Sequence, residues 1–305
     1  MGDFEAKIEE AEGRLFAKYD VSPRRHTIEV GSQRTRIRVL EVGEGPPVFL
    51  LHAGSLFGAV WVPQLARLRG YRLLAPDLPG HGLSGAVDYR GVDLREKFVS
   101  DFTGMLDALE IDQAAVVGNS MGGMYGLWSA LADSTRVTRL VVAGVPGVAL
   151  PGVRGDLSAI LMSTPGLNRF LLRLPTSARL SRTAFKPALK NPASRSADPE
   201  IYEIHCLARR RPEAVLSLST MMERLVRWKT PRPELAIRGD ELARLRIPTR
   251  FLIGDADILG GREIADNAAR HIADSRVHSI SGGHFLCLDQ PDECARLLSE
   301  FLSEA

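Results

Sequence analysis

A single serine stands between glycines in the stretch VVGNSMGG, residues 116–123. The pattern G-x-S-x-G places the Ser120 hydroxyl at the corner between a β-branched run, typical of a buried strand, and a stretch typical of a helix. Glycines permit this tight turn without a Cβ collision, and the Met121 N–H then lies at the positive end of the helix. A serine hydroxyl alone is a weak nucleophile, so the pattern predicts chemistry only if a base and an acid lie elsewhere in the chain.

Candidates for the base and the acid follow two later strands. His284 lies in the glycine loop of SISGGHFL, after an expected strand, and the stretch FLIGDAD ends another expected strand with Asp255 and Asp257. Parallel strands open their loops on one edge of a sheet, so these groups can meet Ser120 there. The chain order Ser, Asp, His is that of nucleophile-elbow hydrolases and differs from other serine hydrolase folds.

The remaining patterns predict the scaffold that holds these residues. Apolar positions at helical spacing predict a helix over residues 3–19, and a second amphipathic helix is expected to start near Asp93. Strands are expected in HTIEV, TRIRVLEV, PPVFLLHAG, AAVVG, RLVVAGV, PTRFLIGDAD and RVHSISGGH, and YRLLAPDLPGHGLSG is expected to be a short strand that ends in a Pro/Gly loop. Strands that alternate with helices predict an α/β fold with a mostly parallel central sheet and helices on both faces.

The alternation stops within the second half of the chain. Residues 148–238 are helical in pattern, rich in Arg, Leu and Pro, and offer no convincing strand. We therefore expect a first core part at 1–147, which includes the N-terminal helix, an inserted helical lid at 148–238, and a second core part at 239–305. Insertions after strands of a parallel sheet surround the ligand crevice.

Five segments in the correct order resemble the α/β-hydrolase fold family with a serine nucleophile and a helical lid. They are LLHAG (oxyanion loop), APDLPGHGLS, VVGNSMGG (nucleophile elbow), IGDAD (acid loop) and GGHFLCLDQPDE (histidine loop). The resemblance implies a triad of Ser120, His284 and Asp257, because the family pattern G-x-x-D fits Asp257 and not Asp255. It also implies an oxyanion hole formed by the backbone N–H groups of Gly54 and Met121.

Other residues of these segments have expected supporting roles. Asn119 either contacts substrate or satisfies backbone groups at the turn, and Phe285, after the histidine, is a second candidate for substrate contact. The family usually has glycine where Ala53 stands. We expect four further residues to shape loops, namely His52, Asp77, His81 and Ser84.

The resemblance predicts a cofactor-independent serine hydrolase that cleaves a carboxylic ester, thioester or lactone through an acyl-enzyme. GNSMGG is also similar to the elbow of hydrolases that cleave carbon–carbon bonds in ring-fission products, although HAGS and Phe285 depart from their HGGG-type loop and tryptophan. Perhydrolase chemistry and a non-catalytic small-molecule receptor on the same fold remain open alternatives. Relatives with an aspartate nucleophile are disfavoured by Ser120.

Composition narrows the possible partners. A net charge of +2 is too small to indicate nucleic acid, and no His or Cys spacing indicates a metal site. The three cysteines are expected to be buried thiols in a reducing compartment, and no apolar run is long enough for a membrane span. We expect a cytoplasmic enzyme with a small-molecule substrate and no membrane partner; the sequence does not indicate an oligomeric state.

Positive charge is concentrated in the expected lid. Residues 148–238 hold 16 Lys and Arg against 7 Asp and Glu. Such residues can coat a solvated outer face, or one or two of them can face the pocket and favour substrates that bear a carboxylate. The candidates for the second role are Arg169, Arg173, Arg179, Arg209, Arg210 and Arg211.

Overall fold

The computed structural model describes residues 3–153, 161–191, 198–227 and 230–304. An eight-stranded sheet forms the centre, in the order β1-β2-β4-β3-β5-β6-β9-β10. Its strands are β1 (Arg24–Val30), β2 (Thr35–Val42), β3 (Pro47–Leu51), β4 (Arg72–Pro76), β5 (Ala114–Asn119), β6 (Val137–Ala143), β9 (Thr249–Gly254) and β10 (Ser275–Ile280). Strand β2 is antiparallel to β1 and β4, whereas the neighbours from β4 to β10 are parallel.

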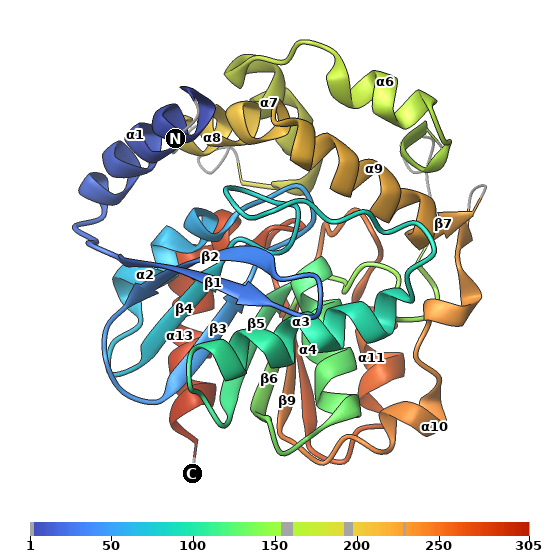
Figure 1. Cartoon of the computed structure of the whole chain (residues 1–305). Coiled ribbons are helices and arrows are strands. Elements are labelled where there is room, and N and C mark those ends of the chain that lie inside the picture. Colours follow the sequence, from blue (N-terminus) through green and yellow to red (C-terminus); the bar gives the residue numbers. More distant parts are fainter. Residues whose placement is uncertain (1–2, 154–160, 192–197, 228–229, 305) are drawn as a thin grey trace.

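Helices cover both faces of this sheet (Figure 1). The helices of the core are α1 (Asp3–Lys18), α2 (Val62–Arg67), α3 (Leu94–Ala108), α4 (Met121–Ala132), α10 (Gly239–Leu242), α11 (Arg262–Ala269), α12 (Leu286–Asp289) and α13 (Pro291–Ser303), with a short 3-10 helix η1 (Gly58–Trp61). The predicted fold class is thereby confirmed. The helix expected near Asp93 begins at Leu94, and the Asp93 carboxylate caps it by accepting from the N–H groups of Arg95 and Glu96.

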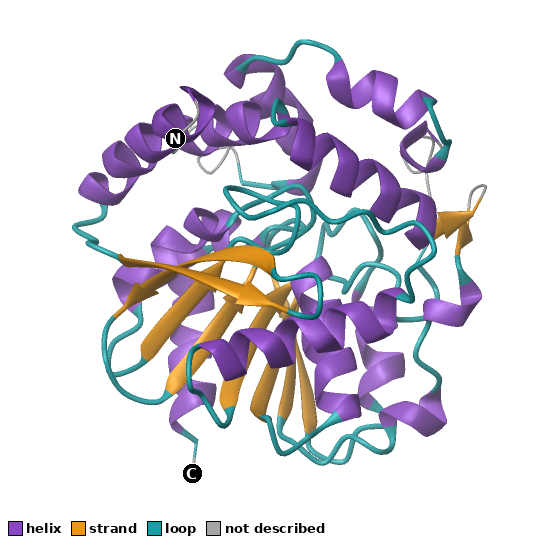
Figure 2. Ribbon diagram, viewed as in Figure 1, coloured by secondary structure: helices purple, strands orange, loops and turns teal. Residues whose placement is uncertain are grey.

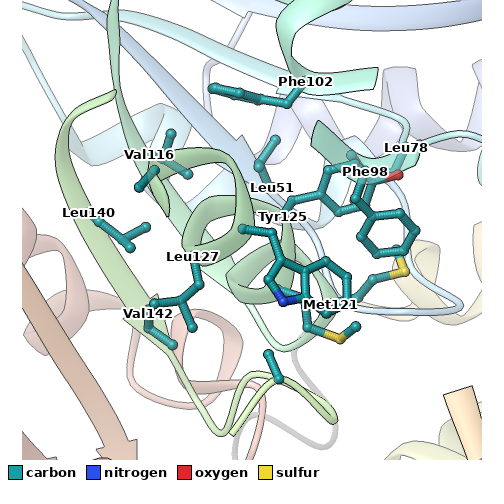
Figure 3. Packing of buried hydrophobic residues seen from close by; sticks show 14 of the residues in the cluster. Leu51, Leu78, Phe98, Phe102, Val116, Met121, Tyr125, Leu127, Leu140 and Val142 are labelled. Atoms are coloured by element: carbon teal, nitrogen blue, oxygen red, sulfur yellow. The ribbon is translucent and has the colours of Figure 1, made fainter. Parts of the chain in front are cut away.

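Two apolar cores fix the central strands from either side. On one face, Phe98 of α3 stacks on Tyr125 of α4 with ring centroids 3.9 Å apart. Figure 3 shows Leu127 of the same helix beside Val142 and other strand side chains. On the other face, α2 and α13 bury their apolar residues against the same strands. The strand ends that carry the predicted functional residues are thus held by packing on both faces.

The segment between β6 and β9 lies above the carboxyl edge of the sheet (Figure 2). Its helices are α6 (Leu167–Arg173), α7 (Ala178–Phe185), α8 (Pro199–Arg209) and α9 (Pro212–Leu225), with 3-10 turns η2 (Lys186–Ala188) and η4 (Pro233–Leu235). We call residues 148–238 the inserted segment. Contrary to the prediction of no strand, it contains a small antiparallel pair, β7 (Val226–Arg227) with β8 (Thr230–Pro231). Two-residue strands are too short to produce a periodic pattern.

Helix α1 joins the core to the inserted segment. The helix predicted over residues 3–19 is present; it packs on the core through Ile8 and Leu15 and also contacts α8. The Lys18 ammonium lies 2.5 Å from the Glu200 carboxylate, and the Tyr19 hydroxyl donates to Asp198 at 2.7 Å. The N-terminal helix therefore supports the inserted segment as well as the sheet.

No helix among the described residues has the length and apolar content that crossing a bilayer requires. The three cysteines are buried free thiols, as predicted. The cytoplasmic location stays a prediction.

A buried cluster of charged side chains attaches α1 to β2. We expect it to contribute strongly to the free energy of unfolding. The Arg38 guanidinium donates to Glu12 at 2.6 Å and to Asp77 at 2.8 Å, and burial raises the pKa of Glu12. We expect Arg38→Met to lower the free energy of unfolding by about 3–5 kcal/mol, because it removes the cation between two buried carboxylates. Urea denaturation, with the exposed Arg34→Met as a matched control, measures this difference. Equal stability of the two variants would contradict it.

Candidate active site

Ser120 occupies a sharp corner between β5 and α4, as predicted. Its backbone has φ 51° and ψ −109°, a left-handed conformation that is uncommon for a residue with a Cβ. The Ser120 N–H donates to the Ala143 carbonyl at 3.2 Å, which ties the corner to the end of β6. Strain retained at one serine by surrounding packing is typical of a functional position.

Glycines on both sides are required by close backbone approach. A Cβ on Gly118 would lie 2.2 Å from the Gly122 carbonyl oxygen. A Cβ on Gly122 would lie 2.1 Å from the carbonyl oxygen of Leu51, at the end of β3. No side chain fits at such distances, so the G-x-S-x-G spacing follows from the packing of α4 against its own strand and against β3.

His284 and Asp257 form a buried pair at the same edge of the sheet. The His284 Nδ1 lies 2.9 Å from both carboxylate oxygens of Asp257. Backbone N–H groups of Val145 and Leu259 also donate to that carboxylate, each at 2.9 Å. With Nδ1–H donated to Asp257, Nε2 is the ring nitrogen left to accept a proton.

Asp255 makes different contacts from Asp257. Its carboxylate accepts from the Lys190 ammonium at 2.6 Å and from the Gly282 N–H at 3.1 Å. The hydrogen bond from Lys190 lowers the pKa of Asp255. The side chain is 45% exposed, whereas that of Asp257 is fully buried against the imidazole. The geometry thus favours Asp257 as the partner of His284.

The loop after β3 approaches the start of α4. The Gly122 N–H donates to the His52 carbonyl at 3.1 Å, and His52 Nε2 accepts from the Leu78 N–H at 2.9 Å. Burial lowers the pKa of His52 to about 3, so its ring is neutral and holds the loop by hydrogen bonds, as predicted. Met121 is the first residue of α4, so its N–H has no intrahelical partner. Gly54 and Met121 both border the same pocket as Ser120.

Asp77, His81 and Ser84 hold their loop through contacts with backbone groups. Asp77 accepts from the N–H groups of Gly58 and Leu83, both at 2.7 Å, and the Ser84 hydroxyl donates to the Asp77 carbonyl at 2.6 Å. The His81 ring contacts the Pro79 carbonyl at 3.0 Å. These bonds confirm the expected loop-shaping roles.

Asn119 lies outside the pocket, whereas Phe285 borders it. The Asn119 amide donates to the carbonyls of Ala143 at 2.6 Å and His284 at 3.0 Å. Of the two roles expected for Asn119, the structure shows the contact with backbone groups. Both amide hydrogens are directed at carbonyls, which leaves no donor for a substrate.

A pocket of about 430 Å³ opens above Ser120 and His284. Its wall comes from the core loops on one side and from α9 and neighbouring parts of the inserted segment on the other. None of the described residues that line it is Lys, Arg, Asp or Glu. The apolar wall includes Met121, Met124, Met162, Leu218, Met221, Met222, Leu225, Ile258 and Leu259.

The sequence profile of the alpha/beta hydrolase family matches residues 48–297 of this chain. The chain belongs to the α/β-hydrolase family. The resemblance drawn from the five segments is confirmed, and the predicted class of hydrolytic enzyme agrees with it.

Relatives of this α/β-hydrolase include enzymes named for two kinds of substrate. A 2-hydroxymuconate semialdehyde hydrolase from Pseudomonas sp. (strain CF600) is 30% identical over 294 residues, which cover 91% of this chain and 94% of the relative. The carboxylesterase CesB from Bacillus subtilis has 18% identity and a TM-score of 0.77, with 99% of both chains covered. The meta-cleavage product hydrolase CumD from Pseudomonas fluorescens IP01 has 26% identity and a TM-score of 0.68, covering 91% of this chain and 97% of its own.

One or two of six arginines were expected as candidates to face the pocket of this α/β-hydrolase, and none of the six lines it. Arg211 is buried and donates to the carbonyls of Gly82 and Ser84. Arg179 is exposed on α7. The other four border a separate groove on the inserted segment, namely Arg169, Arg173, Arg209 and Arg210. Sequence position could not reveal this, because an arginine-rich helix has several faces and only packing decides which one meets the pocket.

Two groups of pocket residues were missed by sequence reasoning. Ser55, one residue after Gly54, borders the pocket in a left-handed conformation with φ 65°. Leu218, Met221, Met222 and Leu225 line it from α9. Their helical spacing was a usable signal, although it is equally typical of an ordinary core-facing stripe.

Proposed function

We propose that this α/β-hydrolase cleaves a neutral, largely apolar carboxylic ester, thioester or lactone through an acyl-enzyme on Ser120. The observation that supports this most is one apolar pocket holding the strained Ser120 beside a histidine that is bonded to a buried carboxylate. The pocket offers no cation among its described lining residues, so a substrate with a buried carboxylate would lack a charge partner.

In the proposed acylation step, His284 Nε2 removes the Ser120 proton as the serine oxygen attacks the ester carbonyl. Asp257 holds the imidazole in the tautomer that this transfer needs and stabilises the cation that forms. The backbone N–H groups of Gly54 and Met121 stabilise the developing oxyanion. His284 then gives its proton to the departing alcohol or thiol.

Deacylation repeats this sequence with water as the nucleophile. His284 accepts a proton from the water, and the carboxylic acid product leaves as Ser120 regains its proton. In this account Asn119 is a positioning residue, because its amide ties the histidine loop to the end of β6. The inserted segment acts as a lid whose α9 side chains exclude water and receive the apolar part of the substrate.

A carbon–carbon bond hydrolase is the second candidate, and the 30% identity to a 2-hydroxymuconate semialdehyde hydrolase favours it. Another relative is named for 2-hydroxy-6-oxo-2,4-heptadienoate, a substrate that carries a carboxylate. The absence of a cation among the described residues that line the pocket makes such an anion the less suitable ligand here.

A matched pair of esters distinguishes these candidates. We expect p-nitrophenyl butyrate to show a kcat/KM on the order of 100-fold above that of mono-p-nitrophenyl succinate, because the latter must bury an unpaired carboxylate in the apolar pocket. The preference should persist at high salt, since screening weakens attraction at exposed charges and does not remove a desolvation cost. A preference for the succinate ester, or faster turnover of a 2-hydroxy-6-oxo-dienoate than of any ester, would contradict the proposal.

A further inference from the structure

The outer part of the inserted segment carries cations with no acidic residue nearby in sequence. Between Asp156 and Asp198 the chain has seven Lys and Arg and no Asp or Glu. Within the described residues of this stretch, Arg173 and Arg179 are exposed and lie within 4.0 Å of no described carboxylate. Their charge is therefore available to an external anion.

Apolar side chains are exposed on the same elements. Helix α6 presents Leu167 and Phe170 to solvent on one face, and Leu174 is exposed directly after the helix; Phe170 is 62% exposed. Leu180 of α7 is 54% exposed. Figures 1 and 2 show α6 and α7 as the outermost layer, beyond α9 and far from the sheet. We call Leu167, Phe170, Arg173, Leu174, Arg179 and Leu180 the outer face.

A basic groove of about 670 Å³ adjoins the outer face, between α1, α6 and the start of α9. Its cations are Lys7, Arg169, Arg173, Arg209 and Arg210. Four of these five side chains are guanidinium groups, which bind phosphate oxygens well, so the groove suits a phosphate group.

We propose that the outer face adsorbs to an anionic phospholipid surface, with lipid phosphates entering the basic groove. Exposed Leu and Phe side chains beside Arg match a surface that is apolar inside and anionic at the headgroups. A symmetric contact with a second copy of this chain would instead bring like charges together. The expected absence of a membrane partner rested on the lack of a spanning segment, which adsorption does not require.

The outer face lies next to the helix that lines the catalytic pocket. The Asn168 amide of α6 donates to the Ser219 carbonyl at 3.0 Å and to the Glu223 carboxylate at 3.1 Å, both on α9. Helix α9 supplies Leu218 and Met222 to the catalytic pocket. Adsorption through α6 therefore places the wall of the apolar pocket close to the lipid, a source of apolar esters. Binding to lipid does not itself depend on the proposed esterase function.

Co-sedimentation with vesicles tests this proposal. We expect the protein to bind vesicles of phosphatidylcholine with phosphatidylglycerol, not phosphatidylcholine alone, and to dissociate as salt rises. The double variant Arg173→Gln, Arg179→Gln should bind at least about tenfold more weakly, since each cation near such a surface contributes roughly fivefold. The double variant Phe170→Ser, Leu174→Ser should also bind more weakly.

The matched control is Arg244→Gln, Arg246→Gln, which removes the same charge from exposed positions before β9, at the opposite end of the sheet. It should bind vesicles as the unaltered protein does, and all variants should hydrolyse a soluble ester normally. Equal loss of binding in the control would overturn the proposal. So would binding of inorganic phosphate without vesicle binding, or a dimer that Phe170→Ser, Leu174→Ser dissociates.

Discussion

Replacing Ser120 with alanine is expected to lower kcat for the best ester by at least about 10³-fold while leaving the fold intact. The loss follows because the acyl group has no oxygen to bond to, and the remaining oxyanion donors supply only residual rate enhancement. Alanine is slightly smaller than serine and adds no group to the crowded corner. Initial rates with p-nitrophenyl butyrate measure the loss of kcat, and thermal unfolding checks that the fold is intact.

Ser129→Ala is the matched control for this variant. Ser129 lies on α4, the helix that follows the nucleophile, and its buried hydroxyl has no hydrogen-bond partner among the described residues. Its loss should leave kcat within about twofold, because Ser129 touches no part of the proposed site. Near-native activity of Ser120→Ala would show that Ser120 is not the nucleophile.

Asp257→Asn is expected to lower kcat on the order of 10⁴-fold. An amide that faces His284 Nδ1 favours the wrong imidazole tautomer and cannot stabilise the imidazolium. The same change also disturbs the N–H groups of Val145 and Leu259, which donate to this carboxylate. Steady-state kinetics on the purified variant measure the effect.

Asp255→Asn provides the comparison, since it makes the same chemical change two residues away. Asp255 is half exposed and pairs with Lys190 in solvent, so its loss should change kcat by no more than a few-fold. If Asp255→Asn were the more damaging variant, Asp255 would be the acid of the site.

The catalytic constellation could be predicted because each member follows a strand of one parallel sheet. Ser120 follows β5, Asp257 follows β9, and His284 follows β10. The carboxyl ends of parallel strands meet at one edge whatever the loops between them contain. The strand pattern and the chain order therefore suffice to predict that Asp257 and His284 lie close together.

The pocket wall could not be predicted in the same way. The side chains that line it from α9, such as Leu218 and Met222, depend on how α9 is rotated above the sheet. That rotation is fixed by long-range contacts, including Arg211 with the Gly82 carbonyl and the Ser217 hydroxyl with the Val87 N–H. No local pattern encodes such pairings. The sequence alone therefore does not show whether the arginines of the inserted segment face the pocket or the solvent.

The buried charge cluster beneath α1 was not predicted, for a similar reason. Glu12 and Arg38 read separately as ordinary surface charges on a helix and a strand. The docking of α1 removes both from water, and the pairing of β2 with β4 brings Asp77 within 2.8 Å of the same guanidinium. Burial of a charge is a property of the tertiary contact and not of the residue type.

Labelling with a fluorophosphonate probe, followed by peptide mass spectrometry, tests the central claim of an activated Ser120 most directly. We expect one covalent adduct, on the peptide that contains Ser120, formed rapidly in the unaltered protein and much more slowly in Asp257→Asn. Ser120→Ala should form no adduct, and Ser129→Ala should label normally. An unlabelled Ser120 in a folded protein would contradict this assignment and favour a non-catalytic receptor, and an adduct on a different residue would assign the nucleophile elsewhere.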